Sequence, residues 1–333
     1  MKKYVALLLA FVLMLCAMVG CGGDAPESSA PEADVKQAVN ISVIAGPTGV
    51  GMVDLMQKQA DGKAANAYTF NVVTAPDQAV AAISNGTADI AAVPTNLAST
   101  LYKKTGGKVQ VLALNTLGVL HILTNGEEVN SVADLRGKTI YTSGQGANPE
   151  YILKYVLEKN GINPATDVTI EYVADNDTLA SVVANGTAKV AMVPEPKASS
   201  VMMQNKDVKR ALNMTEEWNK VSGDDATLVM GCVIARKEFV EQNAAVVAKF
   251  LEEYKTSISA VQTDVEKAAS LCETYAVIPK AALAKQAIPN CGLTYIDGTQ
   301  MKKELSGYLS ILHGYNPAAI GGAIPSDDFY YAQ

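Results

Sequence analysis

Two glycine-rich turns carry the residue types best suited to hold a small molecule. Their members are Gly46, Pro47, Thr48 and Gly49 in the first turn, and Ser143, Gly144, Gln145 and Gly146 in the second. Each turn precedes a segment with helical periodicity, and the free N–H groups and positive dipole end of a helix favour a carboxylate, sulfonate or phosphate. The hydroxyl and amide side chains add further hydrogen-bonding groups. The alternative is that the glycines only let the chain turn from strand to helix.

Polar residues also follow a short apolar run in each half of the chain. Thr95 and Asn96 follow the first run, and Glu195 follows the second at the position equivalent to Thr95. A carboxylate in a cleft accepts hydrogen bonds from a cationic or N–H-bearing ligand. We expect an open cleft to leave Glu195 and Ser143 in water. The alternative for Glu195 is a solvated loop acid or a partner for a nearby lysine.

The chain lacks the spacing patterns of common catalytic and metal sites. No G-x-S-x-G, H-E-x-x-H or C-x-x-C motif occurs, which removes the usual hydrolase, zinc and redox signatures. The two histidines, His121 and His313, are far apart in the sequence, and we expect both to be structural. The sequence therefore predicts no enzymatic activity, no cofactor and no metal site.

A duplication with an offset of 100 residues predicts the elements that position the candidate residues. The sequence of residues 85–94, NGTADIAAVP, recurs as NGTAKVAMVP at residues 185–194. A β-rich run and a short amphipathic helix precede each copy, with the helices expected at 76–84 and 177–184. Asn-Gly suits a helix C-terminus, and the apolar run that follows suits a buried parallel strand. Each copy is therefore predicted to be a βαβ unit.

The duplication predicts two lobes joined by two crossings. We expect an α/β fold with two Rossmann-like lobes, a ligand cleft between them and two hinge crossings, near the β-rich stretches 109–124 and 228–235. Lobe one would comprise residues 39–120 plus 236–333, and lobe two residues 121–235. Ligands of parallel sheets bind beyond the carboxyl ends of the strands. The loops that carry the candidate residues should therefore face one cleft.

Residues 1–20 are predicted to be a signal peptide. Two lysines precede an unbroken apolar run over residues 5–19, which is too short to span a membrane. The small Gly20 before Cys21 resembles the lipobox of bacterial lipoproteins, in which the cysteine becomes the lipid-modified first residue. Residues 21–38 are rich in Gly, Pro, Ala and acid and are predicted to be a flexible tether. We therefore expect an extracytoplasmic protein anchored to the cell membrane through lipid on Cys21.

Composition narrows the choice of partners. The 333 residues are 49% hydrophobic and carry a formal net charge of −7, which is typical of a folded acidic protein. The lack of a long basic run argues against binding of nucleic acid and against electrostatic docking on anionic lipid. We also expect the protein to be a monomer. Three cysteines lie beyond the tether. The sequence leaves two alternatives open for them. Either Cys272 and Cys291 form a disulfide, or Cys232, Cys272 and Cys291 are all buried free thiols.

Several short motifs are shared with one family of transport proteins. They are NGTAD at 85–89, ADLRGK at 133–138, VPEP at 193–196 and RKEF at 236–239. With these motifs the chain resembles type II periplasmic solute-binding proteins of ABC importers, in particular the group that binds nitrate, sulfonate, taurine and thiamine precursors. The resemblance covers residues 40–333.

The resemblance implies a function as well as a fold. It implies capture of a small polar or anionic solute in the inter-lobe cleft and delivery to the permease subunits of an ABC importer. The alternative is a sensory lipoprotein that acts through a membrane receptor. Some thiamine-pyrimidine synthases and porphobilinogen deaminases share the fold, but this chain carries no catalytic motif. The identity of the ligand stays open.

Overall fold

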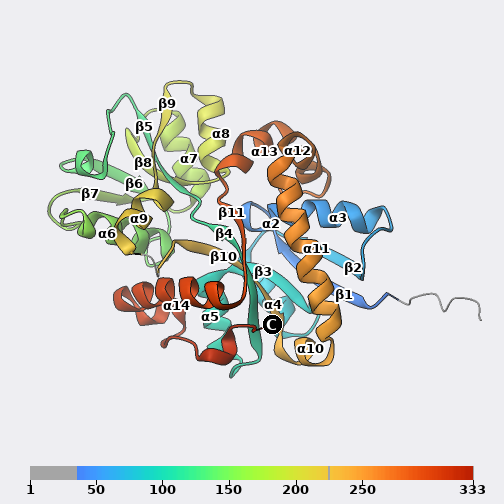
Figure 1. Ribbon diagram of the computed structural model, residues 1–333. Helices are drawn as coiled ribbons and strands as arrows, with labels where there is room; N and C mark the ends of the chain where they lie inside the picture. The colour runs from blue at the N-terminus through green and yellow to red at the C-terminus, as the bar shows by residue number, and fades with distance from the viewer. Residues whose placement is uncertain (1–35, 224–225, 333) are drawn as a thin grey trace, which may run out of the picture. The chain divides into compact units, whose positions relative to one another are not determined.

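A computed structural model describes residues 36–223 and 226–332 (Figure 1). The expected signal peptide (1–20), the expected lipidation site Cys21 and most of the expected tether (21–38) lie outside the described residues. Among the helices of the described part, none combines the length and apolar character that crossing a membrane requires.

The first sheet has six strands in the order β11-β4-β10-β3-β1-β2. In chain order they are β1 (Ala38–Ile44), β2 (Ala67–Val73), β3 (Ile90–Pro94), β4 (Val109–Leu117), β10 (Val229–Arg236) and β11 (Leu293–Ile296). Strand β1 is parallel to β2 and β3, whereas β10 is antiparallel to β3 and β4. Val39, Ile41 and Val43 alternate along β1 and are fully or almost fully buried, because alternate side chains of a strand share one face.

The second sheet has five strands in the order β7-β6-β8-β5-β9. In chain order they are β5 (Leu120–Asn125), β6 (Thr139–Thr142), β7 (Thr169–Tyr172), β8 (Val190–Pro194) and β9 (Val208–Asn213). Strand β6 is parallel to β7 and β8, and β5 is antiparallel to β8. Each sheet thus combines a parallel core with an antiparallel strand that arrives from a crossing.

Helices cover the sheets. The buried hydrophobic side chains of the helices and strands form three clusters. The helices are assigned to the lobes as follows. In lobe one they are α2 (Pro47–Val50), α3 (Val53–Ala60), α4 (Pro76–Ser84), α5 (Thr95–Lys104), α10 (Lys237–Gln242), α11 (Ala244–Thr263), α12 (Val265–Thr274), α13 (Ala281–Ala287) and α14 (Gly298–Tyr315). In lobe two they are α6 (Asn148–Lys159), α7 (Asn176–Ala184), α8 (Lys197–Gln204) and α9 (Met214–Ser222). The 3-10 helices are η1 (Val132–Leu135), η2 (Ile288–Asn290), η3 (Pro317–Ile320) and η4 (Asp327–Phe329).

Both predicted βαβ units are confirmed. They are β2-α4-β3 in lobe one and β7-α7-β8 in lobe two. The Asn-Gly pairs end the helices as expected, since Gly86 and Gly186 have φ of 78° and 82°, a region that glycine enters without steric penalty. The repeat therefore describes two copies of the same supersecondary unit.

The return crossing lies earlier in the chain than the sequence predicted. Residues up to 235 were expected in lobe two, but β10 pairs with β3 and β4 of the first sheet. Backbone pairing places residues 229–235 in lobe one, so the crossing precedes Val229. The first crossing joins β4 to β5 at Gly118, where a Cβ would lie 2.2 Å from the Thr215 hydroxyl. That close approach requires glycine.

An aromatic cluster joins α14 of lobe one to α6 and α9 of lobe two. Trp218 is fully buried, with its ring centroid 4.2 Å from that of Tyr155 and 5.6 Å from that of Tyr308. Tyr308 belongs to α14, which also packs on β4 and β10. The two lobes therefore share a continuous apolar contact next to the crossings.

The three cysteines of the described part are buried free thiols: Cys232, Cys272 and Cys291. The sequence left open either a Cys272–Cys291 disulfide or three free thiols, and the structure shows three free thiols. Burial raises the pKa of each thiol, which lowers its reactivity because the thiolate is the nucleophile.

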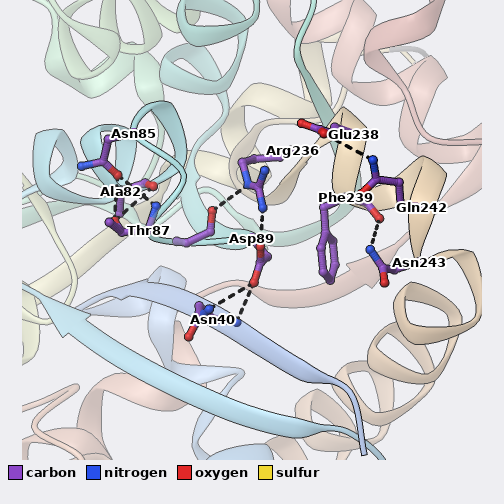
Figure 2. A network of polar contacts seen from close by, with 11 residues as sticks. Asn40, Ala82, Asn85, Thr87, Asp89, Arg236, Glu238, Phe239, Gln242 and Asn243 are labelled. Atoms are coloured by element: carbon purple, nitrogen blue, oxygen red, sulfur yellow. Dashed lines mark hydrogen bonds and ion pairs between the residues drawn. The ribbon is translucent and has the colours of Figure 1, made fainter.

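A buried ion pair joins neighbouring strands of the first sheet at the point where β3 begins (Figure 2). Asp89, 8% exposed, pairs with the Arg236 guanidinium at 2.5 Å and accepts a hydrogen bond from the Asn40 backbone N–H at 2.9 Å. Asn40 lies in β1, Asp89 directly precedes β3 and Arg236 ends β10, so one carboxylate ties three strands together. In the second repeat Lys189 occupies the equivalent position and is exposed.

We predict that Asp89→Asn lowers the free energy of unfolding by about 2 kcal/mol. The amide keeps an acceptor for Asn40 but leaves the Arg236 charge without its partner; the expected loss is below the 3–5 kcal/mol of a fully buried pair because the Arg236 side chain is partly exposed. Lys189→Asn, the matched change in the other repeat, should alter stability by less than about 0.5 kcal/mol. Urea unfolding of the two variants measures both values. Equal losses would contradict the anchoring role of Asp89.

Candidate functional site

The candidate residues lie at the carboxyl ends of parallel strands, beside the two crossings. Thr95 follows β3, and its buried hydroxyl donates to the Val229 carbonyl at the start of β10 at 2.8 Å. Glu195 follows β8, and its backbone N–H donates to the Val119 carbonyl in the first crossing at 2.9 Å. The loop after β3 is thus bonded to the strand that follows the return crossing, and the loop after β8 to the first crossing itself.

The first glycine-rich turn is held rigidly by lobe one. The Gly46 N–H donates to the Val277 carbonyl at 2.8 Å, and the Asn115 amide donates to the Thr48 carbonyl at 3.1 Å. A Cβ on Gly49 would lie 2.4 Å from the Ile44 carbonyl oxygen, so close packing alone demands this glycine. Pro47 and Thr48 are half-buried and are the members of the turn with exposed atoms.

The second glycine-rich turn keeps more of its backbone exposed. Ser143 is only 6% exposed and donates its hydroxyl hydrogen to Asn176 Oδ1 at 2.6 Å, which corrects the expectation that it is solvated. Gln145 and Gly146 are exposed. Gly144 and Gly146 have φ of 77° and 74°, a backbone conformation that favours glycine. The turn leads directly into α6, a twelve-residue helix.

Asn148, the first residue of α6, is a site candidate that the sequence analysis missed. It is 7% exposed, and its Oδ1 has no hydrogen-bond partner among the described residues. A buried polar atom without a partner is costly and calls for a ligand or a water. The Asn-Pro pair directly after the glycine-rich turn was the available signal, since proline marks the first turn of a helix.

Glu195 is buried and paired, contrary to the expectation of a solvated cleft acid. The residue is 3% exposed. Its Oε1 forms an ion pair with Arg210 of β9, and its Oε2 accepts the Ser199 N–H at 3.2 Å. Burial raises the pKa of the Glu195 carboxyl, and the Arg210 guanidinium opposes that rise. With both oxygens engaged, Glu195 fixes the loop after β8 and offers no free charge.

His121 extends this buried cluster to lobe one. Its Nε2 lies 3.9 Å from Glu195 Oε1 and 3.3 Å from the Asn290 carbonyl oxygen of η2. Its Nδ1 has no partner among the described residues. Burial, with a smaller contribution from the Arg210 charge, lowers the pKa of His121 to about 4. The imidazole is therefore neutral at physiological pH. That it is structural stays a prediction of the sequence.

The candidate loops line none of five cavities among the described residues. The largest of these five, about 770 Å3, lies at residues 124–130 and 206–211. A cavity of about 440 Å3 separates Arg210 of lobe two from Gln286 and Asn290 of lobe one. None of the five is lined by either glycine-rich turn. Within the described part, no three His, Cys, Asp or Glu side chains are grouped so as to hold a metal ion.

A sequence model of one family matches residues 51–226, more than half of the chain. Its description is ABC transporter, phosphonate, periplasmic substrate-binding protein. The chain belongs to this family. Membership confirms the predicted role as a solute-binding protein of ABC import systems, because the proteins of this family are the substrate-binding components of such transporters. No curated protein matches the chain.

Solved structures of other solute-binding proteins share the fold of this family member. An ABC transporter protein from Parabacteroides distasonis is 19% identical and superposes with a TM-score of 0.76 over 90% of this chain and 100% of its own. The aliphatic sulphonate-binding protein SsuA from Escherichia coli is 15% identical, with a TM-score of 0.67 over 89% and 94%. A putative sulfonate-binding SsuA from Methylobacillus flagellatus is 16% identical, with a TM-score of 0.60 over 86% and 88%. These similarities confirm the predicted α/β fold with two lobes.

We predict that His121→Gln makes the stability of this family member less sensitive to acid. The folded-state pKa of about 4 lies below the unfolded value of about 6.5. Between these values the unfolded chain binds a proton that the folded chain does not, so the free energy of unfolding rises with pH. This contribution is complete above pH 6.5 and is lost as the pH falls toward 4.

Urea unfolding at pH 7 and pH 5 tests this prediction. Wild type should lose about 2 kcal/mol more than His121→Gln between the two pH values, from integration over the two pKa values. Glu195 and Arg210 are present in both proteins, so the difference isolates the histidine. The same pH dependence in both proteins would contradict a buried, neutral His121.

Proposed function

We propose that this chain captures a small tetrahedral oxyanion of the phosphonate or sulfonate type and delivers it to the permease of an ABC importer. The binding site would lie at the four loops that follow β1, β3, β6 and β8. Gly46, Pro47, Thr48, Gly49, Thr95, Asn96, Ser143, Gly144, Gln145, Gly146 and Glu195 remain the candidate residues of these loops, with Asn148 added. Glu195 would act by fixing its loop.

The charge of these loops carries the choice of ligand. The four loops are residues 46–50, 94–96, 143–147 and 194–196, and Glu195 is the single charged residue among them. The Arg210 guanidinium already neutralises that charge. A cationic ligand would find no free carboxylate there. Backbone N–H groups, the Thr48 hydroxyl and the start of α6 remain, whereas the Thr95 and Ser143 hydroxyls donate to protein acceptors. The remaining groups suit an oxyanion. The proposal thus drops the cationic ligand that Glu195 had favoured.

The named ligands of relatives point in the same direction. The family description names phosphonate, and the Escherichia coli relative is named for aliphatic sulphonate. Both groups are tetrahedral and present three oxygens, which backbone N–H groups at a helix start can bind together. We propose the same class for this chain, without catalysis.

Anchoring and assembly complete the proposed function. We propose that Cys21 is lipidated after removal of residues 1–20, that residues 21–38 act as a tether, and that a monomer faces the permease from outside the cytoplasm. Lobe one would comprise residues 39–120 plus the chain from 229 onward, because β10 belongs to the first sheet.

We predict that methylphosphonate stabilises the protein against heat and that choline does not. A ligand at 100 times its dissociation constant adds about 2.7 kcal/mol to the free energy of unfolding, which differential scanning fluorimetry detects. Methanesulfonate serves as the second oxyanion and acetate as a planar control. Stabilisation by choline with no effect of either tetrahedral anion would contradict the proposed ligand class.

We predict that Cys21→Ser releases the protein from the membrane or leaves the precursor uncleaved. Serine lacks the thiol that receives the lipid, so the mature chain loses its anchor. Fractionation of cells followed by mass spectrometry of the N-terminus measures both effects, with Cys16→Ser as the matched control. A wild-type N-terminus that begins beyond residue 21 without lipid would contradict the anchor.

A further inference from the structure

Residues 315–322, here called the C-terminal strap, contact a candidate loop region in each lobe. The strap starts at the last residue of α14, contains η3 and ends at Gly321 and Gly322. On one side it lies along α5, the helix that begins at Thr95. On the other it reaches α6, the helix that follows the second glycine-rich turn.

The strap is fixed to α5 by buried contacts. The Ser99 hydroxyl donates to the Ile320 carbonyl at 2.7 Å, and the Asn96 amide donates to the Ala319 carbonyl at 3.4 Å. Gly321 has a φ of 87°, and a Cβ there would lie 3.0 Å from Thr100 Cα. The backbone of the strap therefore packs tightly on the start of a lobe-one helix.

A chain of two hydrogen bonds connects the strap to the second glycine-rich turn. The Asn316 Nδ2 donates to the Tyr151 hydroxyl at 2.8 Å, and that hydroxyl donates to the Gly146 carbonyl at 3.0 Å. The Tyr315 ring stacks on the Tyr151 ring at 6.2 Å, and the Tyr315 hydroxyl donates to Glu158 at the end of α6. A lobe-one residue thus reaches the backbone of a lobe-two loop through one tyrosine.

The direction of these hydrogen bonds is determined by the groups around them. Asn316 Oδ1 accepts the Ala318 N–H at 3.1 Å, so the amide presents its donor to Tyr151. A tyrosine hydroxyl that accepts from Asn316 has its single proton free for the Gly146 carbonyl. The Gly146 N–H donates to Glu150 Oε2 at 2.5 Å. Both backbone groups of Gly146 are therefore held by side chains of α6.

We propose that Asn316 and Tyr151 are positioning residues for the ligand, which set the conformation of residues 143–147 when the lobes are together. The proposal rests on the proposed function, because it takes this turn as part of the binding site. Neither residue needs to touch the ligand. Separation of the lobes breaks the Asn316 contact and leaves the Tyr151 hydroxyl oriented by lobe two alone, so the ligand is held by a loop whose shape depends in part on the other lobe.

Two conservative variants remove the connection without removing packing. Tyr151→Phe deletes only the hydroxyl and keeps the ring on Tyr315. Asn316→Asp keeps the acceptor for the Ala318 N–H but replaces the donor with an acceptor, which competes with Gly146 for the tyrosine proton. Tyr155→Phe is the matched control, since Tyr155 lies one turn further along α6, its ring also contacts Tyr315, and its hydroxyl donates to Val221 instead.

Hydrogen exchange of the full chain without ligand tests the positioning directly. Backbone amides of residues 143–148 and of Glu150 should exchange faster in Tyr151→Phe and in Asn316→Asp, and at the wild-type rate in Tyr155→Phe. Unchanged exchange in the first two variants would overturn the inference, whatever the protein binds.

Binding of methylphosphonate tests the consequence for the ligand. The affinity for methylphosphonate should fall roughly threefold to tenfold in each of the two variants, which corresponds to the loss of one neutral hydrogen bond. We expect the loss to come from faster dissociation of the ligand. The double variant should be no weaker than the weaker single one, because both changes break one connection. Faster exchange with unchanged affinity would overturn the role in ligand binding. If wild type fails to bind methylphosphonate, the proposed ligand class fails, while the exchange rates still decide the positioning of the turn.

Discussion

Each sheet of this protein contains a strand that arrives directly from a crossing, and the pairing of these strands constrains everything nearby. Gly231 of β10 lies opposite Pro94 at the end of β3, and Leu120 of β5 lies opposite Pro194 at the end of β8. Antiparallel pairing starts each crossing strand where a parallel strand ends. The loops that follow β3 and β8 are therefore held against the chain segments that join the lobes, which is where a hinge can act on a ligand.

Much of this arrangement was readable from the sequence because it depends on local patterns. The repeat at 85–94 and 185–194 fixed two βαβ units, since Asn-Gly ends a helix and a short apolar run forms a buried strand. The glycine-rich turns were correctly expected between strand and helix. The one misplaced boundary, at residue 235, arose because a strand that follows a crossing has the same apolar pattern whichever sheet it joins.

The side-chain chemistry of the site was less predictable because it depends on partners distant in the sequence. Arg210 carried no signal, since nothing in its sequence neighbours indicates that β9 brings its guanidinium to Glu195. Its presence turns a candidate ligand contact into a structural ion pair. No sequence motif singled out Asn316, and only the packing of α14 against α6 places it beside Tyr151. Burial of Ser143 was equally invisible, because a glycine-rich turn reads as exposed.

The contact of α14 with α6 and α9 has a consequence for spectroscopy. Trp218 is the only tryptophan of the chain, and it is enclosed by Tyr155 of the same lobe and Tyr308 of the other. An indole in so dry a setting emits at short wavelength, and its emission moves to longer wavelength once water reaches it. The protein therefore carries a natural fluorophore at the junction of its lobes, and its intrinsic fluorescence can follow their separation in real time without a label.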